Sequence, residues 1–408
     1  MRLFVVDNNL EGKIGHFYAI DLWIKKEASK RGIDARFFIN RSATDEIIKT
    51  LSAQAIFSYS SYGGTSRDKL SGHVDNFLHV GLQLATELQF LTSEGLSGND
   101  IVFFPMVSQN DIFGCAIWLN RIPHQSRPYV CMNFMRPSFV YLYPQNDTIT
   151  LSGILCRSAA KILLQSLGKE KLIYTAQSAS MAKLLSKLLY HPATESPMLH
   201  TYNLPANQDK PTAVKKFVAE DCRILIIGGS RVEKGFHHVP DLLELLTIKI
   251  SNPSFFVQVT TELHHFKKEI ARLQTMANVE LHLGYLEEAA YFEKLRDTDI
   301  VLLPYDPLLY KYLTSGIFAE AVAMGKVVVA PDSSWMAEQI NNKKGAGKLF
   351  NSFDPPSIAD AVLAAIEDYE TLHSDAVRYA ETWKNEQNLG IYLEGLLTTV
   401  DKRIKAQS

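Results

Sequence analysis

Short apolar segments alternate with longer amphipathic segments along most of the chain. The first apolar segment, Leu3–Asp7, is followed by a polar loop and by a helical pattern that runs from about His16 to Arg31. Gly32 ends this pattern, as glycine commonly does just after a helix, and Asp34–Ile39 is again apolar. A strand, a helix and a second strand in this order predict a parallel sheet with helices on its faces.

The alternation continues through the first half of the chain. Further strand patterns are expected at Thr50–Tyr59, Ile101–Pro105, Tyr129–Phe134 and Leu172–Thr175. Helical patterns are expected at 69–95, 109–120, Leu151–Leu167 and Ala179–Leu189. Leu151–Leu167 is amphipathic and is interpreted as a surface helix with one face packed inward.

Residues 201–217 interrupt the alternation. They hold two prolines, two asparagines and few apolar residues, which is typical of a linker. The chain is therefore divided into an N-terminal domain (1–200), a linker (201–217), a C-terminal domain (218–382) and a final segment (383–408).

The second half repeats the architecture of the first. Strands are expected at Arg223–Ile227, Phe255–Val259, Val279–Leu283, Ile300–Pro304 and Val327–Pro331. Helices are expected at His237–Ile250, His264–Met276, Ala289–Arg296, Ser315–Met324, Pro356–Ala380 and after Gly390. Strands of about five residues with helices between them predict an α/β protein with two doubly wound, Rossmann-like domains.

Composition supports this division and removes several classes of protein. The 408 residues are too many for one hydrophobic core, and 46% hydrophobic with 21% charged residues is ordinary for a globular protein. The four cysteines show no CxxC spacing, so neither a zinc ribbon nor a disulfide framework is indicated. Reduced thiols, the lack of a signal peptide and the lack of a long apolar run favour a cytoplasmic protein.

Charge is nearly balanced over the whole chain but not between its halves. The net charge of −2 argues against a general nucleic-acid binder. Residues 1–200 hold 20 basic and 16 acidic side chains, whereas residues 201–408 hold 22 and 28. The basic excess of the first half suits an anionic acceptor or peripheral contact with the inner face of a membrane, although ordinary surface scatter is the favoured explanation.

A glycine-containing turn, Ile227–Phe236, is the first candidate for chemistry. A strand ends, glycines permit a tight turn and a helical pattern follows, with Arg231 and Lys234 in the loop. Helix N-termini and basic side chains attract anions, so this stretch suits a diphosphate. It fits neither GxxxxGK[ST] nor GxGxxG, which argues against ATP hydrolysis and dinucleotide binding. A simple strand-to-helix turn with solvated charges is the alternative.

A second candidate lies in Leu303–Gly325. A strand leads into a loop of about eleven residues, and Ser315 is then expected to cap a new helix. Backbone N–H groups of Ser315, Gly316 and Ile317 would suit phosphate, and Glu320, one turn deeper, would accept hydrogen bonds from sugar hydroxyls. A carboxylate that only interacts with the helix dipole is the alternative for Glu320.

The second half resembles the C-terminal domain of GT-B glycosyltransferases, specifically the retaining enzymes of glycosyltransferase family 4. The resemblance is carried by Arg231 with Glu233–Gly235, by Gly284–Leu286, by Ile300–Tyr305 and by the stretch from Tyr312 to Pro331. It covers about 110 of the 408 residues directly. It implies a GT-B fold in which two Rossmann-like domains face each other across a cleft and a C-terminal helix crosses back to the first domain.

The resemblance also implies roles for individual residues. Arg231 and Lys234 would hold the donor diphosphate next to Gly229, and Glu320 would bind the donor ribose. Tyr285 and Leu286 would border the nucleobase, and Ser315, Gly316 and Ile317 would contact the distal phosphate. The family has a second glutamate eight positions before Glu320, where this chain has Tyr312. This difference bears on the contact with the donor sugar.

In the first half the resemblance is weaker. Gly15 would let the first loop approach the donor, and His16 would supply a polar group there, although a residue at a helix start is the equal alternative. The family often has a histidine near the sugar after an early strand. This chain offers Asn133 and Arg136 at the corresponding place, as part of an acceptor or sugar pocket.

The resemblance therefore predicts a hexosyltransferase that uses a nucleotide-diphosphate sugar, retains configuration and needs no metal or other cofactor. Its acceptor would be a saccharide, a lipid-linked molecule or another hydroxyl compound, and polysaccharide or glycoconjugate synthesis in bacteria would be a usual role. Asp297–Asp299 forms a DxD pattern, but its place between a helix and a strand favours a turn. A non-catalytic relative that binds a nucleotide or sugar within an assembly is the alternative, and an epimerase on the same fold stays open.

Overall fold

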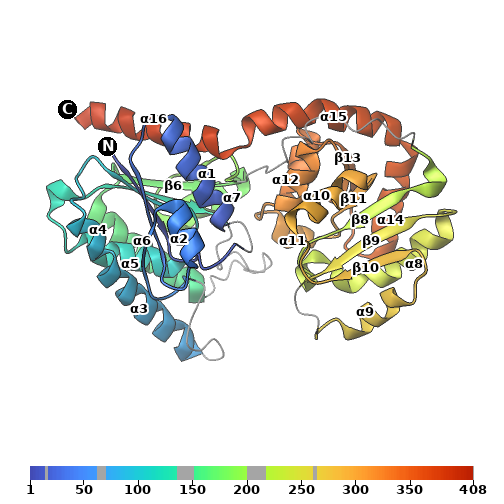
Figure 1. Ribbon diagram of the computed structural model, residues 1–408, viewed down its shortest axis with the longest axis horizontal. Helices are drawn as coiled ribbons and strands as arrows, with labels where there is room; N and C mark the ends of the chain where they lie inside the picture. The colour runs from blue at the N-terminus through green and yellow to red at the C-terminus, as the bar shows by residue number, and fades with distance from the viewer. Residues whose placement is uncertain (14–16, 62–69, 136–150, 200–216, 261–263, 408) are drawn as a thin grey trace. The chain divides into compact units, whose positions relative to one another are not determined.

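The computed structural model describes residues 1–408 except 14–16, 62–69, 136–150, 200–216, 261–263 and 408. It separates into two compact units (Figure 1). Unit 1 comprises residues 1–201 and 387–408, and unit 2 comprises residues 202–386. Each unit has its own parallel sheet with helices on both faces, so the predicted pair of doubly wound α/β folds is confirmed.

Unit 1 contains a seven-stranded parallel sheet with the strand order β3-β2-β1-β4-β5-β6-β7. Its strands are β1 (Leu3–Asp7), β2 (Ala35–Asn40), β3 (Gln54–Phe57), β4 (Ile101–Phe104), β5 (Tyr129–Phe134), β6 (Leu172–Ala176) and β7 (Ala193–Glu195). Its helices are α1 (Phe17–Lys30), α2 (Asp45–Leu51), α3 (Leu70–Glu87), α4 (Gln89–Ser93), α5 (Gln109–Leu119), α6 (Leu151–Leu167), α7 (Ala179–Leu189) and α16 (Leu389–Gln407), with a 3₁₀ turn at His124–Ser126.

Unit 2 contains a six-stranded parallel sheet with the order β10-β9-β8-β11-β12-β13. Its strands are β8 (Arg223–Ile226), β9 (Ser254–Val259), β10 (Val279–Leu283), β11 (Ile300–Leu302), β12 (Val327–Pro331) and β13 (Gly347–Phe350). Its helices are α8 (Val239–Lys249), α9 (Lys267–Gln274), α10 (Glu288–Asp297), α11 (Pro307–Tyr310), α12 (Gly316–Ala323), α13 (Trp335–Asn341), α14 (Pro355–Glu367) and α15 (Tyr369–Glu386), with 3₁₀ turns at 219–221, 232–234 and 236–238.

The last helix returns to unit 1 and completes its core. Leu389, Leu393 and Val400 of α16 are buried in the same apolar cluster as Leu3 and Ile24. The Tyr392 hydroxyl lies 3.0 Å from Thr175 Oγ1, so the returning helix is also fixed by a buried polar contact.

The chain passes back to unit 1 at Gln387, four positions after the start of the predicted final segment. The reason is Trp383, which is buried in unit 2 with ring contacts to Phe318 and Trp335. A single aromatic residue near the end of a helix gives no sign of the unit in which it packs.

Three expected elements differ in detail. The helix expected at 69–95 is divided at Leu88, where Leu91 N donates to Leu88 O in a 3₁₀-type turn. The start of the expected strand Thr50–Tyr59 belongs to α2, which ends at Leu51 and is followed by the C-cap Ser52 with φ +54°. The helix expected at Pro356–Ala380 is two helices, separated at Asp368. Periodicity locates apolar faces but misses such short interruptions.

Among the helices that the structure describes, none combines the length and the apolarity that crossing a bilayer requires.

A group of buried carboxylates lies at the carboxyl end of β1. Asp7 and Asp21 are 2% and 0% exposed, and both oxygens of Asp21 lack a hydrogen-bond partner among the described residues. Burial raises the pKa of Asp7 to about 7 and, with the added charge of Asp7, raises the pKa of Asp21 well above its usual value. Asp111 also lies near Asp7 and has a raised pKa because of burial.

Replacing Asp21 with asparagine is expected to stabilise unit 1 at pH 8 by about 1–3 kcal/mol, since the charged form is then no longer buried without a partner. The raised pKa means that the folded state holds protons which the unfolded state releases. Stability should therefore fall as the pH rises from about 4 to the folded pKa, and the gain from the variant should be small at pH 5. Urea denaturation at pH 5 and pH 8 measures this.

Asp100→Asn is the matched control, and its expected change in stability has the opposite sign. Asp100 is buried but accepts hydrogen bonds from Arg2 and Ser97, and its pKa is lowered. This variant should be less stable than the wild type at pH 8. Equal stability of Asp21→Asn and the wild type at both pH values would show that the buried Asp21 carboxylate does not destabilise unit 1.

Candidate functional site

The candidate site of unit 2 lies at the point in its sheet where the strand order reverses, between β8 and β11. β8 sits between β9, which leads to β10, and β11, which leads to β12 and β13. In open parallel sheets the loops at the carboxyl ends of such neighbouring strands leave a crevice that commonly holds a ligand. The loops after β8 and β11 are the two stretches that the sequence singled out.

The turn after β8 depends on two glycines. Gly228 has φ +106° and Gly235 has φ +68°, which are conformations that other residues adopt only with strain. A Cβ at Gly228 would lie 2.4 Å from Ile317 Cδ1 and 3.1 Å from Lys234 Nζ. A Cβ at Gly235 would lie 1.8 Å from the Pro304 carbonyl oxygen. The glycines thus bring the loop against both the end of β11 and the start of α12.

Two 3₁₀ turns, Val232–Lys234 and Phe236–His238, separate this loop from α8. The N–H groups of Lys234 and Phe236 donate to the Arg231 carbonyl and that of Gly235 donates to the Val232 carbonyl. The predicted direct passage from turn to helix is therefore corrected: the helix proper begins only at Val239. Positive charge in the loop comes from side chains.

The two predicted cations lie in different surroundings. Arg231 Nε is 3.1 Å from a carboxylate oxygen of Glu233, so its charge is partly balanced within the loop. Lys234 Nζ lies 5.2 Å from the centre of the Tyr305 ring, a cation–π arrangement. Lys234 also lines the pocket at this end of the sheet.

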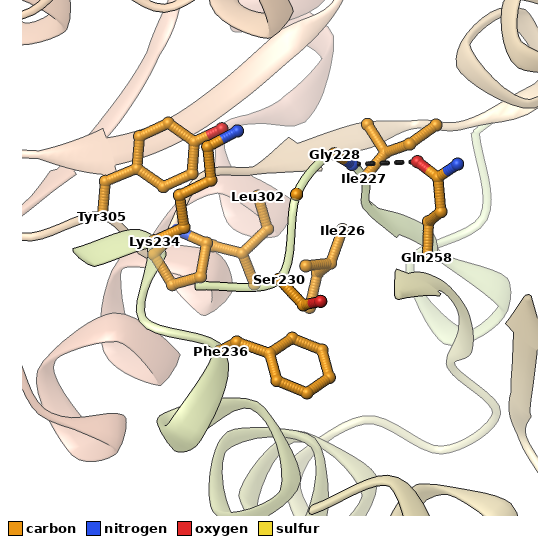
Figure 2. A pocket seen from close by; sticks show the side chains of 11 residues that line it. Ile226, Ile227, Gly228, Ser230, Lys234, Phe236, Gln258, Leu302 and Tyr305 are labelled. Atoms are coloured by element: carbon orange, nitrogen blue, oxygen red, sulfur yellow. Dashed lines mark hydrogen bonds between the residues drawn. The ribbon is translucent and has the colours of Figure 1, made fainter. Parts of the chain in front are cut away.

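Figure 2 shows this pocket, with Lys234 and Tyr305 on one side and Gln258 on the other. Its walls come from the ends of β8, β9 and β11 and from the loop after β8. They comprise Ile226, Ile227, Gly228, Gly229, Ser230, Lys234, Phe236, Gln258, Leu302, Pro304 and Tyr305. Gly229, which was predicted beside the diphosphate, is therefore part of the wall.

The start of α12 faces the same region. Ser315 is the N-cap, and its hydroxyl accepts a hydrogen bond of 3.2 Å from Phe318 N, as predicted. Gly316 and Ile317 form the first turn, and Ile317 approaches Gly228. The helix N-terminus, which favours anions, and the glycine turn thus meet at one place.

Tyr305 contacts Lys234 and interacts with several of the other predicted side chains. Burial raises the pKa of Tyr305 well above its usual value, and the neighbouring Tyr310 and Glu320 add to this rise. Ser315 and Arg231 act on the same hydroxyl in the opposite direction. Residues that are 84 positions apart, Arg231 and Ser315, are therefore close to one phenol.

Glu320 is held by a residue that the sequence did not indicate. The Tyr291 hydroxyl, on α10, donates to Glu320 Oε2. Burial, together with the Glu320 carboxylate, raises the pKa of Tyr291 well above its usual value, so it stays a donor. A tyrosine in an amphipathic helix gave no signal, because its partner lies 29 positions away.

The segment that was expected to border the nucleobase follows β10. Gly284 has φ +107°, Tyr285 is 61% exposed and Leu286 is half-buried. Tyr312, which stands where the resembling family has a glutamate, is half-buried beside Lys311, whose Nζ is 5.8 Å from its ring centre.

The DxD pattern has a structural use. Asp299 accepts hydrogen bonds from Arg223 N at 2.9 Å and from two nitrogens of the Arg223 side chain at 3.0 and 2.7 Å. It lies at the start of β11, away from the carboxyl ends that form the pocket. The interpretation as a turn is confirmed. Within the described parts of the chain, no group of three or more His, Cys, Asp or Glu side chains is arranged to hold a metal ion.

Of the site residues expected in the first half, the structure describes only Asn133. Gly15, His16 and Arg136 lie outside the described residues. Asn133, at the end of β5, is 0% exposed. Its amide nitrogen donates to the Pro105 carbonyl and its oxygen accepts from Thr175 Oγ1, so both polar atoms are used inside unit 1.

Comparisons with known proteins identify the fold. No family model matches the chain, and no curated protein matches its sequence. Among solved structures, it is similar to a sucrose-phosphate synthase from Thermosynechococcus elongatus, with a TM-score of 0.68 and 12% identity over 100% of both chains. It is also similar to an α,α-trehalose 6-phosphate synthase from Burkholderia multivorans, with a TM-score of 0.66 and 10% identity over 100% of both chains.

A third similar structure is the catalytic domain of starch synthase IV from Arabidopsis thaliana, bound to ADP and acarbose, with a TM-score of 0.63 and 11% identity over 99% of each chain. At these identities the likeness establishes the fold. The chain has the GT-B fold, as the resemblance predicted.

Proposed function

We propose that this chain is a glycosyltransferase that moves a hexose from a nucleotide-diphosphate sugar to a hydroxyl group, with retained configuration and without a metal ion. One observation carries the proposal: Lys234, the glycine turn and the first turn of α12 converge at the carboxyl end of the unit-2 sheet. Structures with the same fold include one bound to ADP and acarbose, which supports a nucleoside diphosphate as ligand.

The donor diphosphate would lie against Gly228 and Gly229, with Lys234 and Arg231 nearby. Fixed positive charges and helix N–H groups stabilise the negative charge that develops on a departing diphosphate. Tyr291 donates to one oxygen of Glu320, which orients this carboxylate for the hydroxyls of the donor ribose.

In the proposed step, the bond between the sugar anomeric carbon and the diphosphate oxygen breaks. A bond between that carbon and the acceptor oxygen forms on the same face, and the acceptor proton passes to the departing phosphate oxygen. A saccharide or lipid-linked acceptor would bind unit 1.

A thermal-shift screen with UDP, GDP, CMP, ADP and dTDP, each with Mg²⁺ and with EDTA, tests the proposal. A ligand at about 100 times its Kd stabilises a protein by about 2.7 kcal/mol. We expect one diphosphate to raise Tm equally under both conditions. Sugar release from the matching donor, lost in Glu320→Gln, would then establish catalysis.

Each other outcome has a definite meaning. A shift without turnover would favour the non-catalytic relative that the Tyr312 position suggests. A shift that requires Mg²⁺ would overturn metal independence, and no shift with any diphosphate would overturn the proposed donor class.

A further inference from the structure

Gln258 is an amide in an otherwise apolar strand. β9 reads Ser254–Val259, and Gln258 is 5% exposed between the buried Val257 and Val259. A buried amide costs free energy unless its oxygen and nitrogen both find partners. The buried amide of Gln258 therefore needs specific hydrogen-bond partners.

Both partners are glycines in adjacent loops. Gly228 N donates to Gln258 Oε1 at 3.0 Å, as the dashed line in Figure 2 marks, and Gln258 Nε2 donates to the Gly284 carbonyl at 3.1 Å. β9 lies between β8 and β10 in the sheet. One side chain thus joins the loops that leave its two neighbouring strands.

The two glycines have matching backbone conformations. Their φ angles are +106° and +107°, in the region that favours glycine, and each follows the end of its strand. The Gly228 loop carries Lys234 close to the turn, and the Gly284 loop carries the exposed Tyr285. In the proposed function these loops contact opposite ends of one ligand, the diphosphate and the nucleobase.

We propose that Gln258 is a positioning residue that sets the distance between the diphosphate loop and the nucleobase loop, and so makes the site selective for an intact nucleoside diphosphate. The inference rests on the proposed function. A ligand that must satisfy two loops at once gains affinity when their spacing is fixed in advance. A part of that ligand that contacts only one loop gains little affinity from the hydrogen bonds of Gln258.

The test compares whole and partial ligands in Gln258→Met, which keeps the length of the side chain and removes both hydrogen bonds. The probes are the nucleoside diphosphate that gives the largest thermal shift with the wild type, and inorganic pyrophosphate. We expect Kd for the nucleoside diphosphate to rise about 10-fold, the effect of losing one or two hydrogen bonds, and Kd for pyrophosphate to rise less than about 3-fold. Calorimetry measures both.

Thr298→Val is the matched control. Thr298 is buried at the opposite end of the same sheet, and its hydroxyl donates to the Arg223 carbonyl at 2.9 Å. The Thr298→Val variant should lower Tm by a similar amount to Gln258→Met and leave the dissociation constants of both probes unchanged. Gln258→Asn, which keeps the amide but is too short to reach both loops, serves if the methionine variant does not fold and should show the same selective loss.

Unchanged affinity of the Gln258 variants for the nucleoside diphosphate, or equal weakening of both probes, would overturn the inference while leaving the proposed function intact. If the wild type binds no nucleoside diphosphate, the proposed function itself fails and the inference falls with it.

Discussion

Replacing Lys234 with alanine is expected to weaken nucleoside diphosphate binding by about 1.5–3 kcal/mol, or about 10- to 150-fold in Kd, the range for hydrogen bonds to charged groups. Lys234 Nζ would lie 3.1 Å from a Cβ at Gly228, so the ammonium group is beside the backbone where the diphosphate is proposed to bind. Titration calorimetry at low salt measures the change.

Arg231→Ala should have a smaller effect than Lys234→Ala, because Glu233 lies 3.1 Å from Arg231 Nε and partly balances its charge. Lys249→Ala is the control for lost positive charge on unit 2. Lys249 pairs with Asp360 on the surface at 3.0 Å, and such pairs contribute little. If Lys234→Ala bound the nucleotide as the wild type does, the diphosphate could not lie against this loop.

Replacing Gly235 with alanine is expected to lower the free energy of unfolding of unit 2 by about 2–5 kcal/mol. About 1–2 kcal/mol arises from a Cβ at positive φ. Overpacking adds about 1–3 kcal/mol, because the Cβ would lie 1.8 Å from the Pro304 carbonyl oxygen and the backbone must move. Since Pro304 follows β11, the shift should also displace Tyr305 and weaken nucleotide binding.

Gly32→Ala separates the two contributions. Gly32 has φ +66°, nearly that of Gly235, but an added Cβ would meet no atom within 4 Å. We expect only the conformational part, about 1–2 kcal/mol. Urea denaturation of each variant gives the comparison. Equal losses in the two variants would mean that the β8 loop can move away from Pro304, and that its close approach is not required.

The candidate site was partly visible in the sequence because some of its parts are local. Glycines after a strand predict a tight turn, and Ser315 before an apolar helix predicts a cap. Both depend on residues within a few positions of one another. The resemblance to a family added roles for Arg231, Lys234 and Glu320, which the structure places around Tyr305 and the glycine turn.

The residues that sequence reasoning missed have distant partners. Gln258 bonds to glycines 30 and 26 positions away, and Tyr291 donates to a carboxylate 29 positions away. Gln258 did interrupt an apolar strand, which was a signal of a buried polar role, but nothing local named its partners. Asn133 was expected in an acceptor or sugar pocket, and its amide bonds within unit 1 to Pro105 and Thr175, which lie 28 and 42 positions away.

The sequence by itself determined the two doubly wound folds, the order of their main strands and helices and the glycine turn after β8, but not the short elements β7, β13, α2, α4, α11 and α13. The predicted features follow from hydrophobic periodicity and from the backbone freedom of glycine, which act over one or two turns of chain. Only the tertiary structure decided that Asp299 pairs with Arg223 and that Trp383 packs in unit 2. The physical reason is that hydrogen bonds and side-chain packing depend on which surfaces meet. Residues as far apart as Arg31 and Gly390, 359 positions along the chain, meet only after folding.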